Sequence, residues 1–265
     1  MGYINKIRTE GLSVIVERRL RWYSGMLRVN NRHVGRIVEL LGDHVRLDGL
    51  KYSVDCPLIS TAHKSTIFFG LHEIEERALA RELIPADTPI VEFGGGLGVV
   101  SCLCNAKLTD RNAHVVVEAN PQMVPVLERN KAINGAGFRV INRALAYDSD
   151  LVQMDVHAEF VASSLITNDH DQTVDVQSTT LANVLDGAGF ETVGIVCDIE
   201  GLESDLIERE ILGNRAVKYL LAEMHPQFIG QDTVDTLLTK LRSDGFHLVR
   251  QMGDVVFLER NQQQA

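Results

Sequence analysis

Short apolar runs alternate with segments of helical periodicity from residue 72 to residue 243 of this chain. Apolar runs of about four to eight residues predict strands buried on both faces, and apolar recurrence every three or four residues predicts helices. Regular alternation of the two is typical of a parallel sheet with a helical layer on each face. The predicted strands span residues 89–93, 113–118, 138–142, 192–197 and 218–223, and the predicted helices span residues 72–84, 99–107, 120–135, 181–185, 203–212 and 232–243.

Two regions depart from this alternation. Residues 151–154 and 173–177 are predicted strands with no long helix between them. Near the C-terminal end, residues 246–250 and 255–259 flank Gly253-Asp254, and such a pair between two apolar runs predicts a hairpin. The hairpin would complete a mostly parallel sheet of seven strands with an antiparallel terminal strand. The pattern therefore predicts the α/β, doubly wound class of fold.

The N-terminal part of the chain has a different pattern. Apolar positions recur at helical spacing over residues 3–29. Residues 34–55 are predicted to form short strands, with a turn at Asp48-Gly49. These features predict a small helix-and-strand extension rather than a second large domain. The predicted division is an N-terminal extension at residues 1–65, a main domain at residues 66–260 and a frayed tail at residues 261–265.

Charge is distributed unevenly along the chain. The first 36 residues carry eight basic and two acidic side chains, and the remaining residues carry 18 basic and 34 acidic ones. An acidic body argues against a nucleic-acid partner, because binding to phosphate backbones needs a basic surface. The basic N-terminal segment is compatible with contact to a membrane surface, to an acidic protein or to the acidic body itself. A homo-oligomer is also compatible with the sequence.

Several classes of protein are excluded by the composition. No apolar run approaches the roughly 18–20 residues of a membrane-spanning helix, and the N-terminus lacks the features of a signal peptide. The spacing of the four cysteines indicates neither a disulfide framework nor a zinc site. The sequence thus predicts a soluble, cytoplasmic protein. The cysteines are Cys56, Cys102, Cys104 and Cys197.

A glycine-rich turn follows the first strand of the main domain, at Gly94, Gly96 and Gly98. Glycines at this place allow a ligand to approach the backbone N–H groups and the start of the next helix. Val99 stands where the dinucleotide-binding fingerprint requires a small residue, which disfavours a pyrophosphate ligand. Glu118 ends the second strand, where a carboxylate can accept hydrogen bonds from both ribose hydroxyls. S-adenosylmethionine, a nucleoside without phosphate, is the predicted ligand.

Acidic and imidazole side chains follow two later strands. Asp198 and Glu200 come after the strand at residues 192–197, and Glu223 and His225 come after the next strand. Such groups can orient a substrate hydroxyl, accept its proton or bind a metal. Glu203 is expected to complement the dipole of the helix that starts there.

The segment from Leu71 to Pro226 resembles the FkbM family of S-adenosylmethionine-dependent methyltransferases. The resemblance covers about two-thirds of the chain, and it departs from the family pattern at Glu92 and at Gly94-Gly95-Gly96. The matching segments are His-Glu-Ile-Glu (72–75), Val-Glu-Phe-Gly-Gly-Gly-Leu-Gly (91–98), Val-Val-Glu-Ala-Asn-Pro (116–121), Leu-Glu-Arg-Asn-Lys-Ala-Ile-Asn (127–134), Ser-Ser-Leu (163–165), Thr-Leu (180–181), Asp-Ile-Glu-Gly-Leu-Glu (198–203) and Ala-Glu-Met-His-Pro (222–226).

The resemblance implies a Rossmann-like class I methyltransferase fold and methyl transfer to a hydroxyl of a sugar or another small metabolite. In this reading Asp198 faces the methionine end of the cofactor or the acceptor. His225, unprotonated, is the expected general base, with Glu200 and Glu223 as alternatives. The expected cofactor contacts are Glu92, Gly94, Gly96, Gly98, Glu118, Asn142, Ala144 and Asp198.

Three alternatives stay open at this point. A divalent metal at Asp198, Glu223 and His225 is disfavoured, because only one nitrogen ligand is present and no His-x-His or cysteine pair accompanies it. Transfer without a metal is therefore predicted. A nicotinamide-dependent oxidoreductase is disfavoured by Val99 and by the C-terminal hairpin. A protein that binds the cofactor without catalysing a reaction is the third alternative.

Overall fold

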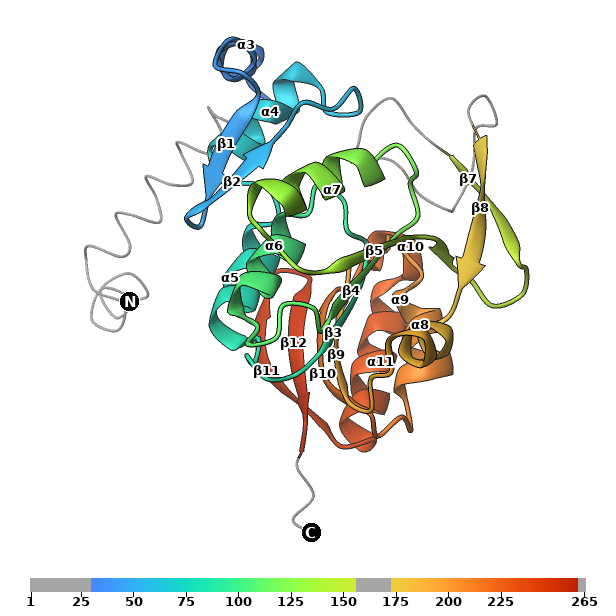
Figure 1. Ribbon diagram of the computed structural model, residues 1–265. Helices are drawn as coiled ribbons and strands as arrows, with labels where there is room; N and C mark the ends of the chain where they lie inside the picture. Colours follow the sequence, from blue (N-terminus) through green and yellow to red (C-terminus); the bar gives the residue numbers. More distant parts are fainter. Residues whose placement is uncertain (1–29, 156–172, 262–265) are drawn as a thin grey trace, which may run out of the picture.

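A computed structural model describes residues 30–155 and 173–261 of the chain. Its centre is a sheet of seven strands (Figure 1). Five of them pair in parallel, and the last strand of the chain pairs antiparallel to both of its neighbours. The order across the sheet is β5 (Arg139–Asn142), β4 (His114–Glu118), β3 (Ile90–Phe93), β9 (Val193–Cys197), β10 (Val217–Glu223), β12 (Val255–Arg260) and β11 (Phe246–Met252).

This strand order confirms the predicted Rossmann-like class I methyltransferase fold. Its distinguishing feature is the insertion of the antiparallel strand β12 between β10 and β11. The chain runs from β3 outward to β4 and β5, and later returns to the opposite side of β3 through β9. Ligands of open α/β sheets bind at such a reversal point, at the carboxyl ends of the strands. The carboxyl ends of β3, β4, β9 and β10 are therefore the region in which a site is expected.

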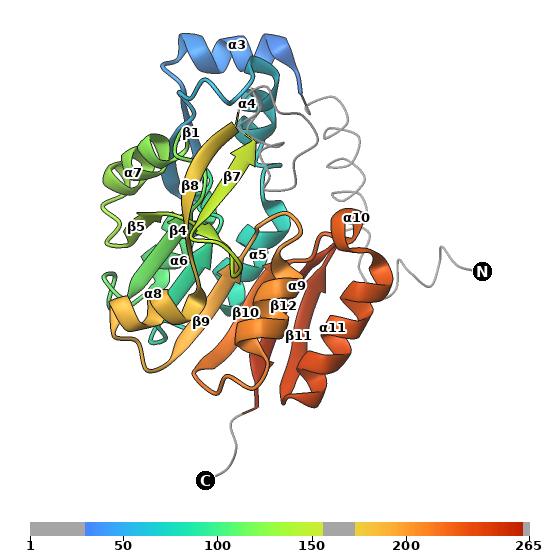
Figure 2. The ribbon, with the colours of Figure 1, turned by 90° about the vertical axis from the view of Figure 1, so that its right-hand side faces the viewer.

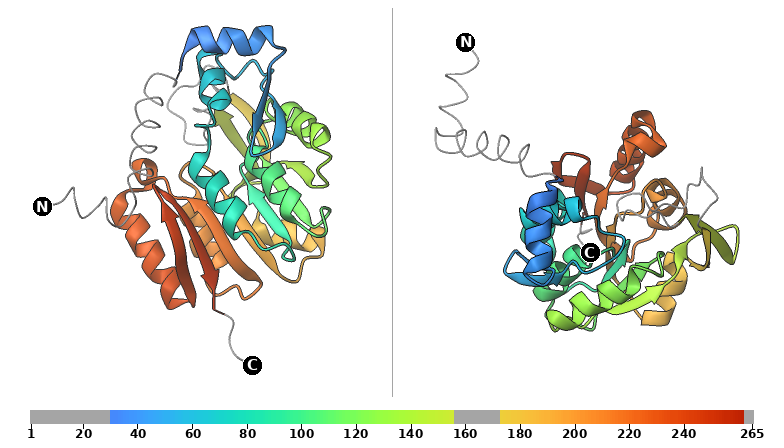
Figure 3. Two further views of the ribbon diagram at one scale, coloured as in Figure 1. Left: turned by 90° about the vertical axis from the view of Figure 1, so that its left-hand side faces the viewer. Right: turned by 90° about the horizontal axis from the view of Figure 1, so that it is seen from above.

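Helices cover both faces of the sheet (Figures 2 and 3). Successive strand residues point to opposite faces, so that Ile195 of β9 packs with one helical layer and Val196 with the other. One layer contains α5 (Ile74–Leu83), α6 (Val99–Lys107) and α7 (Val124–Ile133); the other contains α8 (Leu181–Ala188), α9 (Glu203–Leu206) and α11 (Gln231–Ser243). None of the described helices is long and apolar enough to span a membrane.

The described part of the N-terminal extension contains α3 (Arg32–Leu40), β1 (His44–Leu47), β2 (Leu50–Ser53) and α4 (Thr61–Phe68). The hairpin of β1 and β2 confirms the predicted turn at Asp48-Gly49. The prediction of a strand over residues 34–40 was wrong, because this segment is helical. The side chain of Asn31 caps the helix by accepting hydrogen bonds from the backbone N–H groups of His33 and Val34. The helix predicted over residues 3–29 lies outside the described residues.

The extension packs directly on the main domain. The phenol of Tyr52 in β2 donates a hydrogen bond to the carbonyl of Val99, and the Asn130 side chain binds both backbone groups of Ser53. Buried residues of the extension and of α6 and α7 belong to one hydrophobic cluster. The predicted division at residue 65 falls within α4, and the division into domains stays a prediction.

Two other elements differ from the prediction. The helix expected from Asn120 begins at Val124, because the Asn120 side chain accepts a hydrogen bond from the N–H of Gln122 and closes a turn instead. The helix expected over residues 203–212 is α9 followed by a π-helical turn, η2 (Ile207–Ile211). Outside the central sheet, β8 (Thr173–Thr179) pairs with β7 (Leu151–Asp155) and with β6 (Ala144–Leu145), and α10 (Pro226–Ile229) follows β10.

Candidate active site

The glycine-rich turn connects β3 to α6 and lies against the loop that follows β9. Gly94, Gly96 and Gly98 have φ angles of 90°, 49° and 77°, values that favour glycine. A Cβ atom on Gly94 would lie 1.8 Å from the carbonyl oxygen of Asp198. The close contact between the two loops therefore requires glycine at position 94, whether or not a ligand is bound.

Glu118 joins the ends of β3 and β4. One carboxylate oxygen accepts a hydrogen bond of 2.7 Å from the N–H of Gly96, and the other accepts one of 2.6 Å from the N–H of Asn120. Burial raises the pKa of this carboxyl group, and the backbone donors of Gly96 and Asn120 act against that rise. The side chain is thus held at the predicted ribose position, and its contact with a ribose stays a prediction.

Two other predicted cofactor contacts lie beside Glu118. The Asn142 side chain donates hydrogen bonds to the carbonyl groups of Glu118 and Ala119. Ala144 in β6 is fully buried and belongs to a small apolar cluster with Met154 and Val176. Asn142 therefore fixes the loop after β4, and the expected contact of both residues with adenine stays a prediction.

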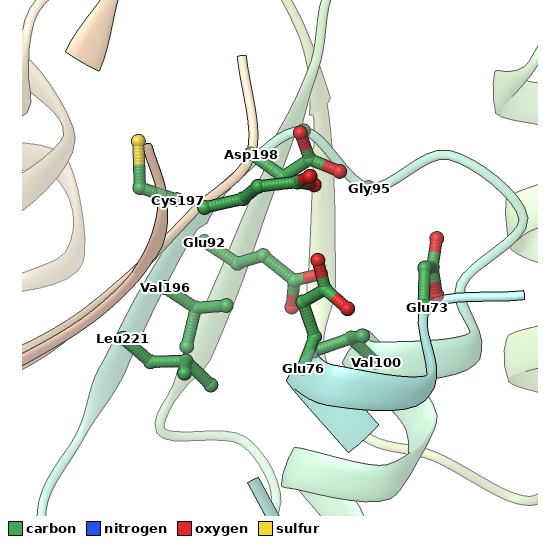
Figure 4. A pocket seen from close by; sticks show the side chains of 11 residues that line it. Glu73, Glu76, Glu92, Gly95, Val100, Val196, Cys197, Asp198 and Leu221 are labelled. Carbon is green, nitrogen blue, oxygen red and sulfur yellow. The ribbon is translucent and has the colours of Figure 1, made fainter. Parts of the chain in front are cut away.

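A small cavity of about 20 Å³ lies next to the glycine turn, with room for about one water molecule. The carboxyl groups of Glu76, Glu92 and Asp198 point toward the same space (Figure 4). Five of the described residues around it are acidic and none is basic. The lining residues are Glu73, Glu76, Glu92, Gly94, Gly95, Val100, Val196, Cys197, Asp198, Leu221 and Glu223.

Glu92 occupies the floor of this cavity, on β3. It is 1 % exposed and accepts a hydrogen bond of 2.6 Å from the Ser101 hydroxyl. Its second carboxylate oxygen lies 3.0 Å from Nε2 of the fully buried His114. Both oxygens of Glu92 thus have partners inside the protein, and its predicted role at the cofactor stays a prediction.

Glu76 was missed by the sequence analysis. Burial, together with a hydrogen bond between Glu76 and Glu223, raises the pKa of the Glu76 carboxyl group to about 9. A signal was present in the sequence, because Glu76 lies on the same helical face as Leu79 and Ala80, which are buried. A charged residue on an apolar helix face requires a partner.

His225 lies at the centre of a group of carboxylates that follow β9 and β10. Its Nδ1 is 2.7 Å from Oε1 of Glu203. Its Nε2 is 3.5 Å from Oδ1 of Asp198 and 3.7 Å from Oε2 of Glu223. The structure thus brings together Asp198, Glu223 and His225, three of the four residues predicted to be catalytic.

The surroundings of His225 act against the predicted unprotonated state of its imidazole, and its role as the general base stays a prediction. Burial lowers the pKa of the imidazole, but the hydrogen bond with Glu203 and the charges of Asp198 and Glu223 outweigh it and raise the pKa to about 9. These carboxylates therefore favour the charged form of the imidazole. The sequence could not show this, because the pKa depends on the distances in the folded chain between His225, Glu223 and the segment that contains Asp198 and Glu203.

Glu203 is a second residue whose role was underestimated. It stands at the start of α9, as expected, but it is fully buried. One oxygen contacts His225 and the other accepts a hydrogen bond of 2.9 Å from the N–H of Gly201. Glu203 therefore positions the imidazole, and the helix-dipole interpretation accounts for only part of its surroundings.

Asp198 and Glu200 both interact electrostatically with His225 and Glu223. Burial and the nearby charge of Glu223 raise the pKa of Asp198 well above its usual value. Burial is also the main cause that raises the pKa of Glu200 to about 7, and Glu200 has a positive φ of 46°. These carboxylates are thus partly desolvated and repel one another, so the space between them favours a cation.

Comparisons with known proteins leave the family of this chain open. The sequence matches no known family pattern and no curated protein. The resemblance to the FkbM family therefore stays a prediction.

Solved structures with a similar fold include three proteins of low sequence identity. A protein of the NADB-Rossmann superfamily from Streptococcus agalactiae shares 10 % identity over 72 % of this chain and 69 % of its own, with a TM-score of 0.42. Precorrin-6y C5,15-methyltransferase from Geobacter metallireducens shares 13 % identity over 69 % of this chain and 84 % of its own, with a TM-score of 0.40. Fibrillarin from Aeropyrum pernix, with natively bound S-adenosyl-L-methionine, shares 11 % identity over 69 % of this chain and 72 % of its own, with a TM-score of 0.43. At these values the similarities imply nothing about the activity or the ligand of this chain.

Proposed function

We propose that this chain is an S-adenosylmethionine-dependent methyltransferase that acts on a hydroxyl group of a sugar or another small metabolite. The observation that carries the proposal is the carboxylate-lined space beside the glycine turn. Glu73, Glu76, Glu92, Asp198 and Glu223 border it, and no basic residue does so among the described ones. Burial is the main cause that raises the pKa of Glu76 and of Asp198, and the neighbouring Glu223 adds to it; a cationic ligand would favour the charged form of these carboxyl groups.

The charge of the ligand distinguishes the two nucleotide classes that this fold can bind. S-adenosylmethionine carries a positive sulfonium and a positive ammonium group, and both are attracted by carboxylates. A nicotinamide dinucleotide carries a negative diphosphate, which these carboxylates would repel. Val99 adds to this difference, because it is the first residue of α6, where a dinucleotide-binding turn requires a small residue.

The residues at the ends of β3, β4 and β5 are proposed to hold the cofactor. Glu118 would accept hydrogen bonds from the ribose, and Gly94, Gly96 and Gly98 would form the backbone turn beside it. Glu92 would contribute charge near the methionine end, while Asn142 and Ala144 would border the adenine. The bound cofactor would supply a methyl group already activated by the positive sulfur.

Asp198, Glu200, Glu223 and His225 are proposed to face the acceptor. Because the surrounding carboxylates raise the pKa of His225, a carboxylate, Asp198 or Glu223, is proposed to accept the hydroxyl proton in place of the imidazole. The resemblance to the FkbM family supports a hydroxyl acceptor. The net charge of residues 37–265, with 18 basic and 34 acidic side chains, supports a small molecule rather than a nucleic acid.

Calorimetric titration of the full-length protein with S-adenosylmethionine, S-adenosylhomocysteine and NAD tests the cofactor. We expect saturable binding of the first two and none of NAD. Mass spectrometry of a panel of sugars and hydroxylated metabolites, incubated with protein and cofactor, then tests transfer through the gain of one methyl group. Binding of NAD alone would contradict the proposal, and cofactor binding without a methylated product across the panel would favour a non-catalytic binding protein.

A further inference from the structure

We propose that Asp198, Glu223 and His225 bind one divalent metal ion of the Mn²⁺ or Zn²⁺ type. Each residue offers one ligand atom, and these three atoms lie within 4.8 Å of one another. His225 Nε2 is 3.5 Å from the nearest Asp198 oxygen and 3.7 Å from the nearest Glu223 oxygen. An ion with bonds of about 2.0–2.2 Å in a tetrahedral arrangement separates its ligand atoms by about 3.4 Å. The three side chains therefore stand close to the spacing that an ion requires.

Glu203 fixes the orientation of the His225 imidazole through Nδ1, the ring nitrogen that does not face Asp198 and Glu223. Nδ1 of His225 lies 2.7 Å from Oε1 of Glu203, and the other Glu203 oxygen accepts a hydrogen bond from Gly201. A carboxylate that binds one nitrogen of a histidine directs the lone pair of the other nitrogen toward the metal and is typical of metal sites. Here the second nitrogen faces Asp198 and Glu223. This arrangement is an observation independent of the clustering of acidic residues.

Nε2 is the nitrogen of His225 that faces Asp198 and Glu223. The His225 side chain is 7 % exposed. Its two neighbours on this side are carboxylate oxygens at distances longer than a hydrogen bond. A nearly buried ring nitrogen that faces two carboxylate oxygens across such a gap suits a cation with short bonds to all three atoms.

Two carboxylates and one imidazole also specify the kind of ion. Carboxylates suit Mn²⁺ and Mg²⁺, and imidazole suits Zn²⁺ and other transition metals, so a mixed set favours Mn²⁺ or Zn²⁺. Binding displaces any proton on Nε2, because a metal ligand must offer its lone pair. This inference departs from the metal-free expectation of the sequence analysis, which counted nitrogen ligands and could not place Glu203 behind His225.

The site deepens the proposed function. If the chain transfers a methyl group to a hydroxyl, an ion at this place would bind the acceptor oxygen and favour loss of its proton. That role rests on the proposed function, whereas metal binding itself does not. The two proposals are therefore tested by separate titrations.

Calorimetric titration of the full-length, chelator-treated protein with Mn²⁺ tests the site. We expect one saturable ion per chain, with affinity lowered at least tenfold by Asp198→Asn and by Glu223→Gln. The matched control is Glu208→Gln, which changes an acidic residue of η2 paired with Lys240 and should leave the affinity unchanged. Thermal unfolding shows that each variant is folded, and paramagnetic broadening of the His225 ring signals by Mn²⁺ provides a readout that needs no variant.

Three outcomes would overturn the inference. The first is that the wild-type protein shows no saturable binding of Mn²⁺. The second is that neither Asp198→Asn nor Glu223→Gln changes the affinity for Mn²⁺, and the third is that Mn²⁺ does not broaden the His225 ring signals. The carboxylates would then serve only to hold a protonated imidazole. Titration of the chelator-treated protein with S-adenosylmethionine separates the two proposals, because Mn²⁺ binding without cofactor binding would contradict the proposed function and leave the metal site intact.

Discussion

The two sides of the candidate site use carboxylates in different ways. On the side of β4, both oxygens of Glu118 accept hydrogen bonds from backbone N–H groups, and Asn142 fixes the loop behind it. On the side of β9 and β10, the carboxylates of Asp198 and Glu223 have an imidazole as their nearest cation. The first arrangement stabilises one geometry of the chain. The second leaves negative charge in excess, and a bound cation would relieve it.

The largest effect on catalysis should come from the side of β9 and β10, here called the acidic side, which contains Asp198, Glu223 and His225. Glu223→Gln removes one candidate proton acceptor and metal ligand, and we expect kcat to fall by about 10²–10⁴-fold. The affinity for S-adenosylmethionine should change much less, because Glu118 is untouched. Steady-state kinetics and calorimetry on the same preparation measure both quantities. A loss of cofactor affinity as large as the loss of kcat would show that the two sides do not have separate roles.

The converse change concerns Glu118. Glu118→Ala should weaken S-adenosylmethionine binding by about 1.5–3 kcal/mol, which is typical of a hydrogen bond to a charged group. Glu118→Gln keeps one acceptor oxygen and should lose less. Calorimetry measures the affinity, and thermal unfolding identifies any variant in which the loops have lost their structure. Unchanged affinity in a folded Glu118→Ala protein would remove the ribose assignment.

A third prediction concerns the support of the glycine turn. Asn130 is fully buried, and its side chain binds both backbone groups of Ser53 and the carbonyl of Leu97. Asn130→Ala should lower the free energy of unfolding by about 1–3 kcal/mol, because buried polar groups lose their partners. Urea denaturation measures this change in the free energy of unfolding. The control is Asn134→Ala at the residue that follows the same helix, because the hydrogen bonds of Asn134 to Lys51 are exposed and their loss should cost less.

The smallest predicted effect is on the pH dependence of stability, and it comes from the different surroundings of His63 and His225. Burial, together with the neighbouring His72, lowers the pKa of His63 to about 4, whereas carboxylates raise that of His225. The unfolded chain therefore binds a proton at His63 below about pH 6.5 while the folded chain does not, and stability falls as the pH falls toward 4. We expect a loss on the order of 1–2 kcal/mol between pH 7 and pH 5. Urea denaturation at several pH values should show a flatter profile for His63→Gln, and an identical profile would contradict the assignment.

The sheet could be predicted from the sequence because its strands are short apolar runs bounded by clear turn residues. The helix of α3 could not, because the β-branched residues Val34, Ile37 and Val38 favour strands locally, and the cap at Asn31 decides the outcome. The positions of the glycine turn and of Glu118 could be predicted for the same reason, because they lie at the ends of strands with clear apolar patterns.

The interactions within the acidic side were less predictable. Asp198, Glu223 and His225 could be placed at one edge from the strand pattern. The contact of His225 with Glu203 spans 22 positions, and the hydrogen bond between Glu76 and Glu223 joins two distant elements. The pKa of each group depends on the sum of these charges. Only the folded arrangement determines that sum.

The contact between Gly94 and Asp198 has a consequence for motion. The N–H of Gly94 donates to the carbonyl of Val117, and the N–H of Asp198 donates to the carbonyl of Phe93. The loop after β3 is therefore joined through its main chain to β4, and the loop after β9 is joined in the same way to β3, with no side chain between the two loops at Gly94. A ligand at this edge meets a single rigid platform. Adjustment there is left to rotations of side chains on the picosecond to nanosecond scale, and slower hinge movement would have to come from other segments.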